Sequence, residues 1–84
     1  MYKIVLHGRA KKDIEKVKQS ALFEKLTSLV EALKEAPYAP PFEKLKGNRK
    51  EYFSRRINKQ HRLVYNVNDE TNTITILSCW SHYE

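Results

Sequence analysis

Apolar and polar residues recur with two different periods along this chain, and the change of period marks its elements. Residues 2–6 form a short run rich in β-branched and apolar side chains that stops at Gly8, which predicts one strand. From Ala10 the apolar residues recur at steps of three and four, as on one face of an amphipathic helix. The stripe breaks near Ser20 and resumes at Leu22, so the pattern predicts two helices packed as a hairpin. The two stripes are Ala10, Ile14, Val17 and Ala21, and then Leu22, Leu26, Leu29, Val30 and Leu33.

Period-two patterns dominate the C-terminal half. The loop over residues 37–47 contains three prolines that end the second helix, because proline lacks an amide hydrogen and disfavours helical angles in the residue before it. Residues 52–65 predict a strand–turn–strand hairpin, in which β-branched and aromatic residues flank a polar turn. A second polar turn at 69–72 leads into the clearest strand of the chain, residues 73–80.

This order predicts an α+β fold over a single domain of residues 1–84. The elements follow as β-α-α-β-β-β, with two helices packed on one face of a mainly antiparallel four-stranded sheet. The period-two rule assigns the hairpin residues to opposite faces. The buried face is expected to contain Phe53, Ile57, Leu63, Tyr65 and Val67, and the other face Tyr52, Ser54, Arg56, Arg62 and Val64.

Charge narrows the classes of partner. The 84 residues carry a formal charge of +6, which favours nucleic acid, an anionic membrane surface or an acidic protein. Residues 44–62 contain eight basic residues and one acid, so most of the positive charge is local. No apolar run approaches the ~20 residues of a membrane span, and the first residues lack the apolar region of a signal peptide. We therefore expect a cytoplasmic protein that does not bind a membrane.

The single cysteine, Cys79, cannot form an internal disulfide, and no Cys/His spacing resembles a zinc site. A reducing compartment and a fold without metal or cofactor are therefore expected. We expect Cys79 itself to be a small core residue.

Four residues of types used in RNA cleavage come from separate parts of the predicted fold. Glu43 lies in the loop, the arginines lie on adjacent strands, and His82 is near the chain end. This topology can bring Glu43, Arg56, Arg62 and His82 together on the sheet face without helices. Metal-free RNA cleavage needs a base for the ribose 2′-OH, cations for the pentacoordinate phosphate and an acid for the 5′-oxygen. A carboxylate, guanidinium groups and an imidazole fit these roles.

Each of these residues also has a purely structural explanation. An exposed strand arginine or lysine usually only solubilises a sheet, and we expect this for Arg55 and Lys59. For Arg56 and Arg62 the structural and functional explanations weigh equally. A glutamate in such a loop normally faces solvent, and a histidine near a terminus is normally a loose polar residue.

Four aromatic residues could stack on unpaired bases: Tyr52, Tyr65, Trp80 and Tyr83. For Tyr65 and Trp80, packing in the core or against the sheet is the better explanation.

Three motifs carry a resemblance to a known family. They are Tyr52-Phe53-Ser54-Arg55-Arg56-Ile57-Asn58-Lys59-Gln60-His61-Arg62-Leu63-Val64-Tyr65, the terminal His82-Tyr83-Glu84, and Pro41-Phe42-Glu43-Lys44-Leu45-Lys46-Gly47. In this order they resemble the Txe/YoeB toxins of the RelE-like superfamily. The specific part of the resemblance covers the C-terminal half, whereas the helical half agrees only in length and pattern.

The resemblance implies the toxin of a bacterial type II toxin–antitoxin system, an endoribonuclease that enters the ribosomal A site and cuts mRNA there. Its implied partners are mRNA, the ribosome with the rRNA of the 30S A site, and a cognate acidic antitoxin of the YefM/Axe kind that covers the basic face. A homodimer stays open. By motif, the implied catalytic residues are Glu43 as general base, Arg62 as a phosphate-binding cation and His82 as general acid. The implied RNA or phosphate contacts are Lys46, Arg56 and Tyr83.

Two alternatives stay open at this point. One is a toxin of the ParE kind that shares the fold but inhibits a protein target without nuclease activity. The presence of Glu43, Arg62 and His82 in this sequence argues against a toxin without nuclease activity. The other is a non-catalytic RNA-binding module that uses the basic face.

Overall fold

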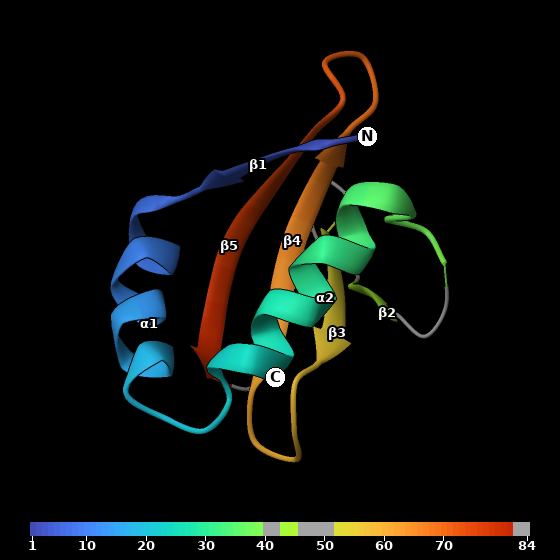
Figure 1. The fold of residues 1–84 in the computed structure, drawn as a ribbon. Coiled ribbons are helices and arrows are strands. Elements are labelled where there is room, and N and C mark those ends of the chain that lie inside the picture. Colours follow the sequence, from blue (N-terminus) through green and yellow to red (C-terminus); the bar gives the residue numbers. More distant parts are fainter. Residues whose placement is uncertain (40–42, 46–51, 82–84) are drawn as a thin grey trace.

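The computed structural model describes residues 1–39, 43–45 and 52–81, with the side chains of Glu43, Leu45 and Ser81 outside that description. The strands join in one sheet in the order β1-β5-β4-β3-β2 (Figure 1). Only β1 and β5 run parallel, and the other neighbours are antiparallel. The elements are β1 (Lys3–Leu6), α1 (Gly8–Lys18), α2 (Phe23–Glu35), β2 (Glu43–Leu45), β3 (Tyr52–Arg56), β4 (Arg62–Asn68) and β5 (Thr73–Ser81).

The predicted α+β class and element order are confirmed, with one addition. The stretch expected to be only an extended loop contains the three-residue strand β2, which pairs with β3 at the edge of the sheet. Three residues are too few to produce a recognisable alternation of apolar and polar side chains. The strand therefore exists because β3 offers a free edge, which only the folded sheet reveals.

Both helices pack on one face of the sheet, with α1 beside β1 and β5 and α2 crossing β4 and β3 (Figure 1). Their apolar stripes meet the predicted buried face of the hairpin. The break near Ser20 is confirmed, because the Ser20 hydroxyl donates to the Val17 carbonyl and accepts the amide of Leu22. Ala21 departs from its predicted place in the stripe: it lies exposed in the connection between the helices. The described core side chains are Ala10, Val17, Leu26, Leu33, Phe53, Ile57, Leu63, Tyr65, Ile74, Ile76 and Cys79.

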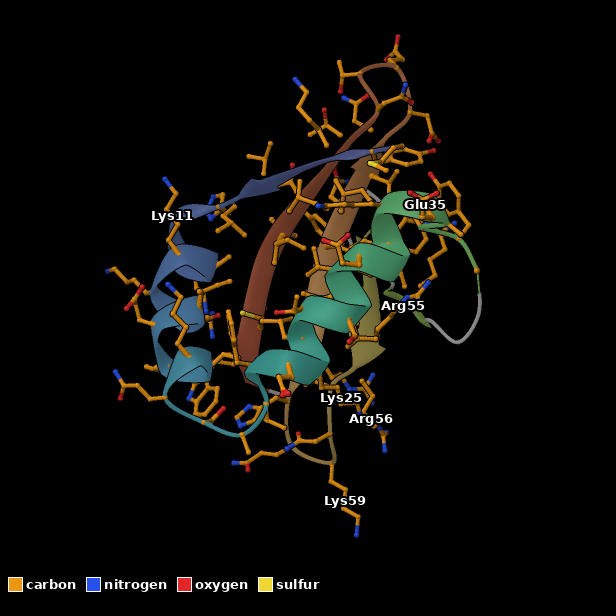
Figure 2. The ribbon with its side chains drawn as sticks, viewed as in Figure 1. Lys11, Lys25, Glu35, Arg55, Arg56 and Lys59 are labelled. Carbon is orange, nitrogen blue, oxygen red and sulfur yellow. The ribbon has the colours of Figure 1, made fainter. Side chains whose placement is uncertain are left out.

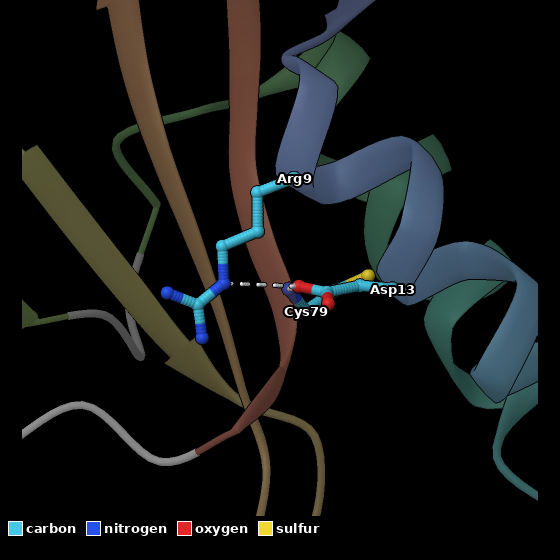
Figure 3. A network of polar contacts seen from close by, with 3 residues as sticks. All are labelled: Arg9, Asp13 and Cys79. Carbon is cyan, nitrogen blue, oxygen red and sulfur yellow. Dashed lines mark hydrogen bonds and ion pairs between the residues drawn. The ribbon is translucent and has the colours of Figure 1, made fainter.

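A buried carboxylate completes the edge of β5. The strand β1 pairs with β5 only as far as Leu6 and Ile76, whereas β5 continues to Ser81. Beyond that point the Asp13 side chain of α1 accepts the amide hydrogen of Cys79 at 3.0 Å, and Arg9 lies 3.9 Å from the same carboxylate (Figure 3). Asp13 thus replaces the missing strand partner, since an unpaired buried amide costs free energy.

Cys79 is fully buried, which confirms its prediction as a core residue. Burial, and then the negative charge of Asp13, raise the pKa of its thiol to about 12. At pH 8 only about one thiol in 10⁴ is ionised at that pKa, and the thiolate is the reactive form. We expect the native protein to react with a thiol-specific disulfide reagent far more slowly than the protein in urea, as absorbance will measure. Equal rates in the two states would contradict this burial.

Asp69 links three segments that are distant in sequence. Its carboxylate accepts hydrogen bonds from the Tyr2 hydroxyl at 2.6 Å and the Tyr38 hydroxyl at 2.8 Å. These bonds, with that of Tyr2 the larger cause, hold the pKa of Asp69 below its ordinary value of 3.8. A lowered carboxyl pKa stabilises the fold fully above the pKa of the unfolded chain, and this stabilisation is lost as pH falls through the folded-state pKa.

We therefore expect Asp69→Asn to lower the melting temperature by a constant amount between pH 5 and 7. The difference from the wild type should shrink as pH falls below about 4, where Asp69 is protonated first in the unfolded chain and then, at lower pH, in the folded protein. Thermal melts followed by circular dichroism across this pH range measure it. A difference of the same size at pH 2.5 would show that the charge of Asp69 is irrelevant.

Candidate functional site

The register of the sheet brings the candidate positions onto neighbouring strands. Arg56 of β3 pairs directly with Arg62 of β4, and Arg62 pairs with Ser81 of β5, which immediately precedes His82. On the other side of β3, Glu43 of β2 pairs with Ser54, two residues before Arg56. Directly paired residues lie ~4.5–5.5 Å apart in an antiparallel sheet. The backbone therefore gathers these positions within a small area spanning four strands.

The two arginines share the face opposite the helices, as predicted. The side chain of Arg62 is half-buried, and its Nη1 lies 3.5 Å from the hydroxyl of Ser54 on the same face. Arg56 is exposed at the end of β3. Two guanidinium groups on adjacent strands can donate to different oxygens of one phosphate.

Three buried residues lie near Arg62 on the face of the sheet opposite the helices. Ser54 is 1% exposed, and its neighbours across the sheet, Val64 and Ser78, are also buried although they face away from the helices. Sequence analysis assigned no function to the two serine hydroxyls. The sequence by itself places Ser78 only in the terminal strand. The face of the sheet on which Ser78 lies follows from the pairing register of β4 and β5.

Arg55 contradicts the prediction of an exposed, solubilising side chain. It is 7% exposed, and its Nη2 donates to the carbonyl of Ala39 at 2.6 Å and, more weakly, to that of Ala36 at 3.4 Å. Figure 2 shows it beside the end of α2, whereas Arg56 and Lys59 extend away from the molecule. Lys59 is exposed, as predicted. The error has a simple cause: Arg55 alternates with Phe53 and Ile57, so the period-two rule itself places it on the helix face.

The predicted packing roles of Tyr65 and Trp80 are confirmed. Tyr65 is fully buried and its hydroxyl donates to the carbonyl of Pro37 at 3.0 Å, while burial raises the pKa of that hydroxyl. Trp80 stacks on the imidazole of His61, with ring centroids 4.2 Å apart. His61 and Trp80 immediately precede Arg62 and Ser81, which pair with each other in the sheet. Sequence analysis missed His61, although its place beside Arg62 in the hairpin motif was a signal.

Comparison with known proteins identifies the family, since residues 11–83 match the YoeB-like toxin of bacterial type II toxin–antitoxin systems. The chain belongs to this family. A curated toxin YoeB from Synechocystis sp. is 39% identical over 66 residues, which cover 75% of this chain and 73% of the relative.

Solved structures agree with this membership. A YoeB/ParE toxin from Agrobacterium tumefaciens has a TM-score of 0.87 at 32% identity, covering 96% of this chain and 99% of the other. YoeB from Staphylococcus aureus has been solved as a dimer, with a TM-score of 0.83, 36% identity and 98% of each chain covered. The same toxin in complex with YefM has a TM-score of 0.80 at 35% identity and 99% of each chain covered. The fold is thus that of the RelE/YoeB-like toxins, as predicted.

The described part of this YoeB-like chain contains only some of the candidate residues. Arg56 and Arg62 are placed with their side chains, and Glu43 is placed by its backbone alone. Lys46, His82 and Tyr83 lie outside the described residues. Within residues 1–39, 43–45 and 52–81, no group of three or more His, Cys, Asp or Glu side chains could hold a metal ion. No helix in those ranges is long and apolar enough to cross a membrane.

Proposed function

We propose that this YoeB-like toxin is a ribosome-dependent endoribonuclease that cuts mRNA in the ribosomal A site and so inhibits translation. The observation that carries the proposal is the direct pairing of Arg56 with Arg62 on the face opposite the helices. Arg62 of that pair also pairs with Ser81, the residue before His82, and the backbone of Glu43 pairs with Ser54, two residues before Arg56. Two guanidinium groups, a carboxylate and an imidazole are the side-chain types that metal-free phosphodiester cleavage needs.

In the proposed reaction, Glu43 takes the proton of a ribose 2′-OH, and the freed oxygen attacks the adjacent phosphorus. The P–O2′ bond forms while the P–O5′ bond breaks, and His82 donates a proton to the leaving 5′-oxygen. Arg62 and Arg56 stabilise the extra negative charge on the pentacoordinate phosphate. Lys46 and Tyr83 add contacts that position the RNA. The products are a 2′,3′-cyclic phosphate and a 5′-hydroxyl, and because the 2′-OH is the nucleophile, the proposed reaction requires neither an activated water nor a metal ion.

A translation extract with a defined mRNA tests this proposal. Primer extension should show toxin-dependent cuts inside the codon that occupies the A site, and mass spectrometry should find cyclic phosphate at the new 3′ ends. Translation arrest without cuts would instead support a ParE-like toxin that acts on a protein. Binding to RNA without either effect would support a non-catalytic RNA-binding module.

The proposed antitoxin is acidic, partly disordered when free, and folds over the basic face around Arg56 and Arg62. The solved YoeB–YefM complex supports an antitoxin as partner, and the solved YoeB dimer supports self-association as a second assembly. The proposed setting is the cytoplasm, where the ribosomes are.

Charge complementarity mainly raises the association rate, whereas apolar burial mainly limits dissociation. Raising the salt concentration should therefore slow association of toxin and antitoxin more than it speeds dissociation. Stopped-flow fluorescence from 50 to 500 mM salt measures both rates. An association rate unaffected by salt would place the antitoxin on the helices and away from the basic face.

A further inference from the structure

Arg55 is a buried guanidinium that donates hydrogen bonds to backbone carbonyls and interacts with the hydroxyl of Tyr65. Among the described ion pairs none involves it, although a buried charge is costly unless it is well bonded. Its Nη2 instead donates to two carbonyls of the segment after α2, at Ala39 and Ala36. Its Nε is also buried, and no described residue accepts a hydrogen bond from it. Apolar side chains of similar volume would fill the same space at lower cost, so the position points to a role in fixing the backbone.

Two further contacts fasten the same segment, residues 36–39, to the sheet. The hydroxyl of Tyr65 donates to the Pro37 carbonyl at 3.0 Å. The ring of Tyr38 packs edge-on against Phe53, with centroids 5.6 Å apart. Arg55 and Phe53 belong to β3 and Tyr65 to β4, so the segment is held against the two strands that also carry the arginine pair.

This anchored segment leads directly into β2. Glu43 follows Ala39 by four residues, and four residues span at most about 14 Å. The strand β2 has three residues and pairs only with β3 at the edge of the sheet, so its own hydrogen bonds define its register weakly. A slip of one residue would exchange the two faces for every side chain of a strand. An anchor at Ala39 therefore limits how far along the edge of β3 each residue of β2 can reach.

We infer that Arg55 is a positioning residue: by holding residues 36–39 it sets the register in which Glu43 pairs with Ser54. For its effect on cleavage this inference rests on the proposed function, in which Glu43 is the general base. A base displaced by about 1 Å can lose ~10²-fold in rate. Arg55 itself lies on the helix face, whereas Arg56 and Arg62 lie on the opposite one, so the inferred effect on the reaction is transmitted through β2.

Three variants separate positioning from simple loss of stability. Arg55→Met keeps the length of the side chain but removes its donors, and Arg55→Lys keeps the charge with a single donor group in place of the planar fork. Val17→Ala is the matched control, because it creates a cavity in α1, which forms neither the anchored segment nor β2. The wild type and the three variants are compared at a temperature at which thermal unfolding curves show that each protein is folded.

Two measurements follow on each variant. Nuclear Overhauser effects between Lys44 and Phe53, which pair in the wild type, report the register of β2. Cleavage on programmed ribosomes is measured as a function of ribosome concentration. For Arg55→Met we expect the Lys44–Phe53 signals to be lost and the saturating rate to fall by about 10²-fold, with the half-saturating ribosome concentration almost unchanged. Arg55→Lys should show part of the Lys44–Phe53 signals and part of the wild-type saturating rate. Val17→Ala should retain the signals and the rate.

Unchanged Lys44–Phe53 signals in Arg55→Met would overturn the inference, as would a loss of activity no greater than in Val17→Ala. If Arg55→Met does not fold, Arg55→Lys carries the test, and a wild-type register and rate in that variant would likewise overturn the inference. If the wild type does not cleave mRNA at all, the proposed function fails. The register signals still decide whether Arg55 sets the pairing of β2.

Discussion

Replacing Arg62 by alanine is expected to slow mRNA cleavage on programmed ribosomes by about 10²–10³-fold. Arg62 lies in the sheet between Arg56 and Ser81, on the face opposite the helices. Its charge is proposed to act on the pentacoordinate phosphate, where charge develops only during the reaction. Its contribution to folding is expected to be smaller, because the side chain is half-buried on the face opposite the helices and its hydrogen bond to Ser54 is long at 3.5 Å. We expect a loss of stability of about 1 kcal/mol or less.

Paired measurements of cleavage rate and melting temperature test this expectation. Glu43→Ala and His82→Ala belong in the same series, with expected losses of about 10²–10⁴-fold for a general base and a general acid. Lys59→Ala is the control, since Lys59 is an exposed residue of the same hairpin and should leave the rate unchanged. Arg55→Ala cannot serve as a control, because that side chain is buried and anchors the backbone. An Arg62→Ala toxin that cuts at the wild-type rate would remove Arg62 from the catalytic set.

Cleavage of the same RNA free in solution is expected to be at least about 10³-fold slower than cleavage on the ribosome. The proposed site is assembled from side chains on the face of the sheet opposite the helices, and a single free strand must lose its conformational freedom to fit it. A ribosome that presents the codon in one conformation supplies this ordering in advance, and correct orientation contributes several kcal/mol to catalysis. Single-turnover rates with one defined mRNA, with and without programmed ribosomes, measure the ratio.

Two controls accompany this comparison. Arg62→Ala should reduce the rate of cleavage on ribosomes. If trace cleavage of free RNA comes from a contaminating nuclease, the same substitution should leave that trace unchanged. EDTA is added together with enough magnesium to keep the ribosomes intact. Toxin-dependent cleavage should be unaffected by this addition. Equal rates on free and ribosome-bound mRNA would show that the toxin positions its substrate without help.

The amino-acid sequence determined the elements whose periodic pattern is long. Two helical stripes, the hairpin faces and the terminal strand were all predicted, since burying an apolar face leaves a repeat of three to four residues in a helix and of two in a strand. The shared face of Arg56 and Arg62 followed from the same rule, whereas their direct pairing came from the register in the structure. Local motifs in the C-terminal half were enough to indicate the family.

Only the tertiary structure decided the features that depend on contacts between distant segments. The strand β2 forms because β3 has a free edge, Asp13 is buried because β5 extends beyond β1, and the carbonyl of Ala39 after α2 accepts a hydrogen bond from Arg55, whose face the period-two rule gives but whose partner it does not. Each is a backbone group satisfied by a partner remote in sequence, and such pairing leaves no periodic trace in the chain. The pattern of the sequence therefore specified the layers of this toxin, whereas the folded sheet specified how the backbone carrying Glu43 is held beside the arginine pair.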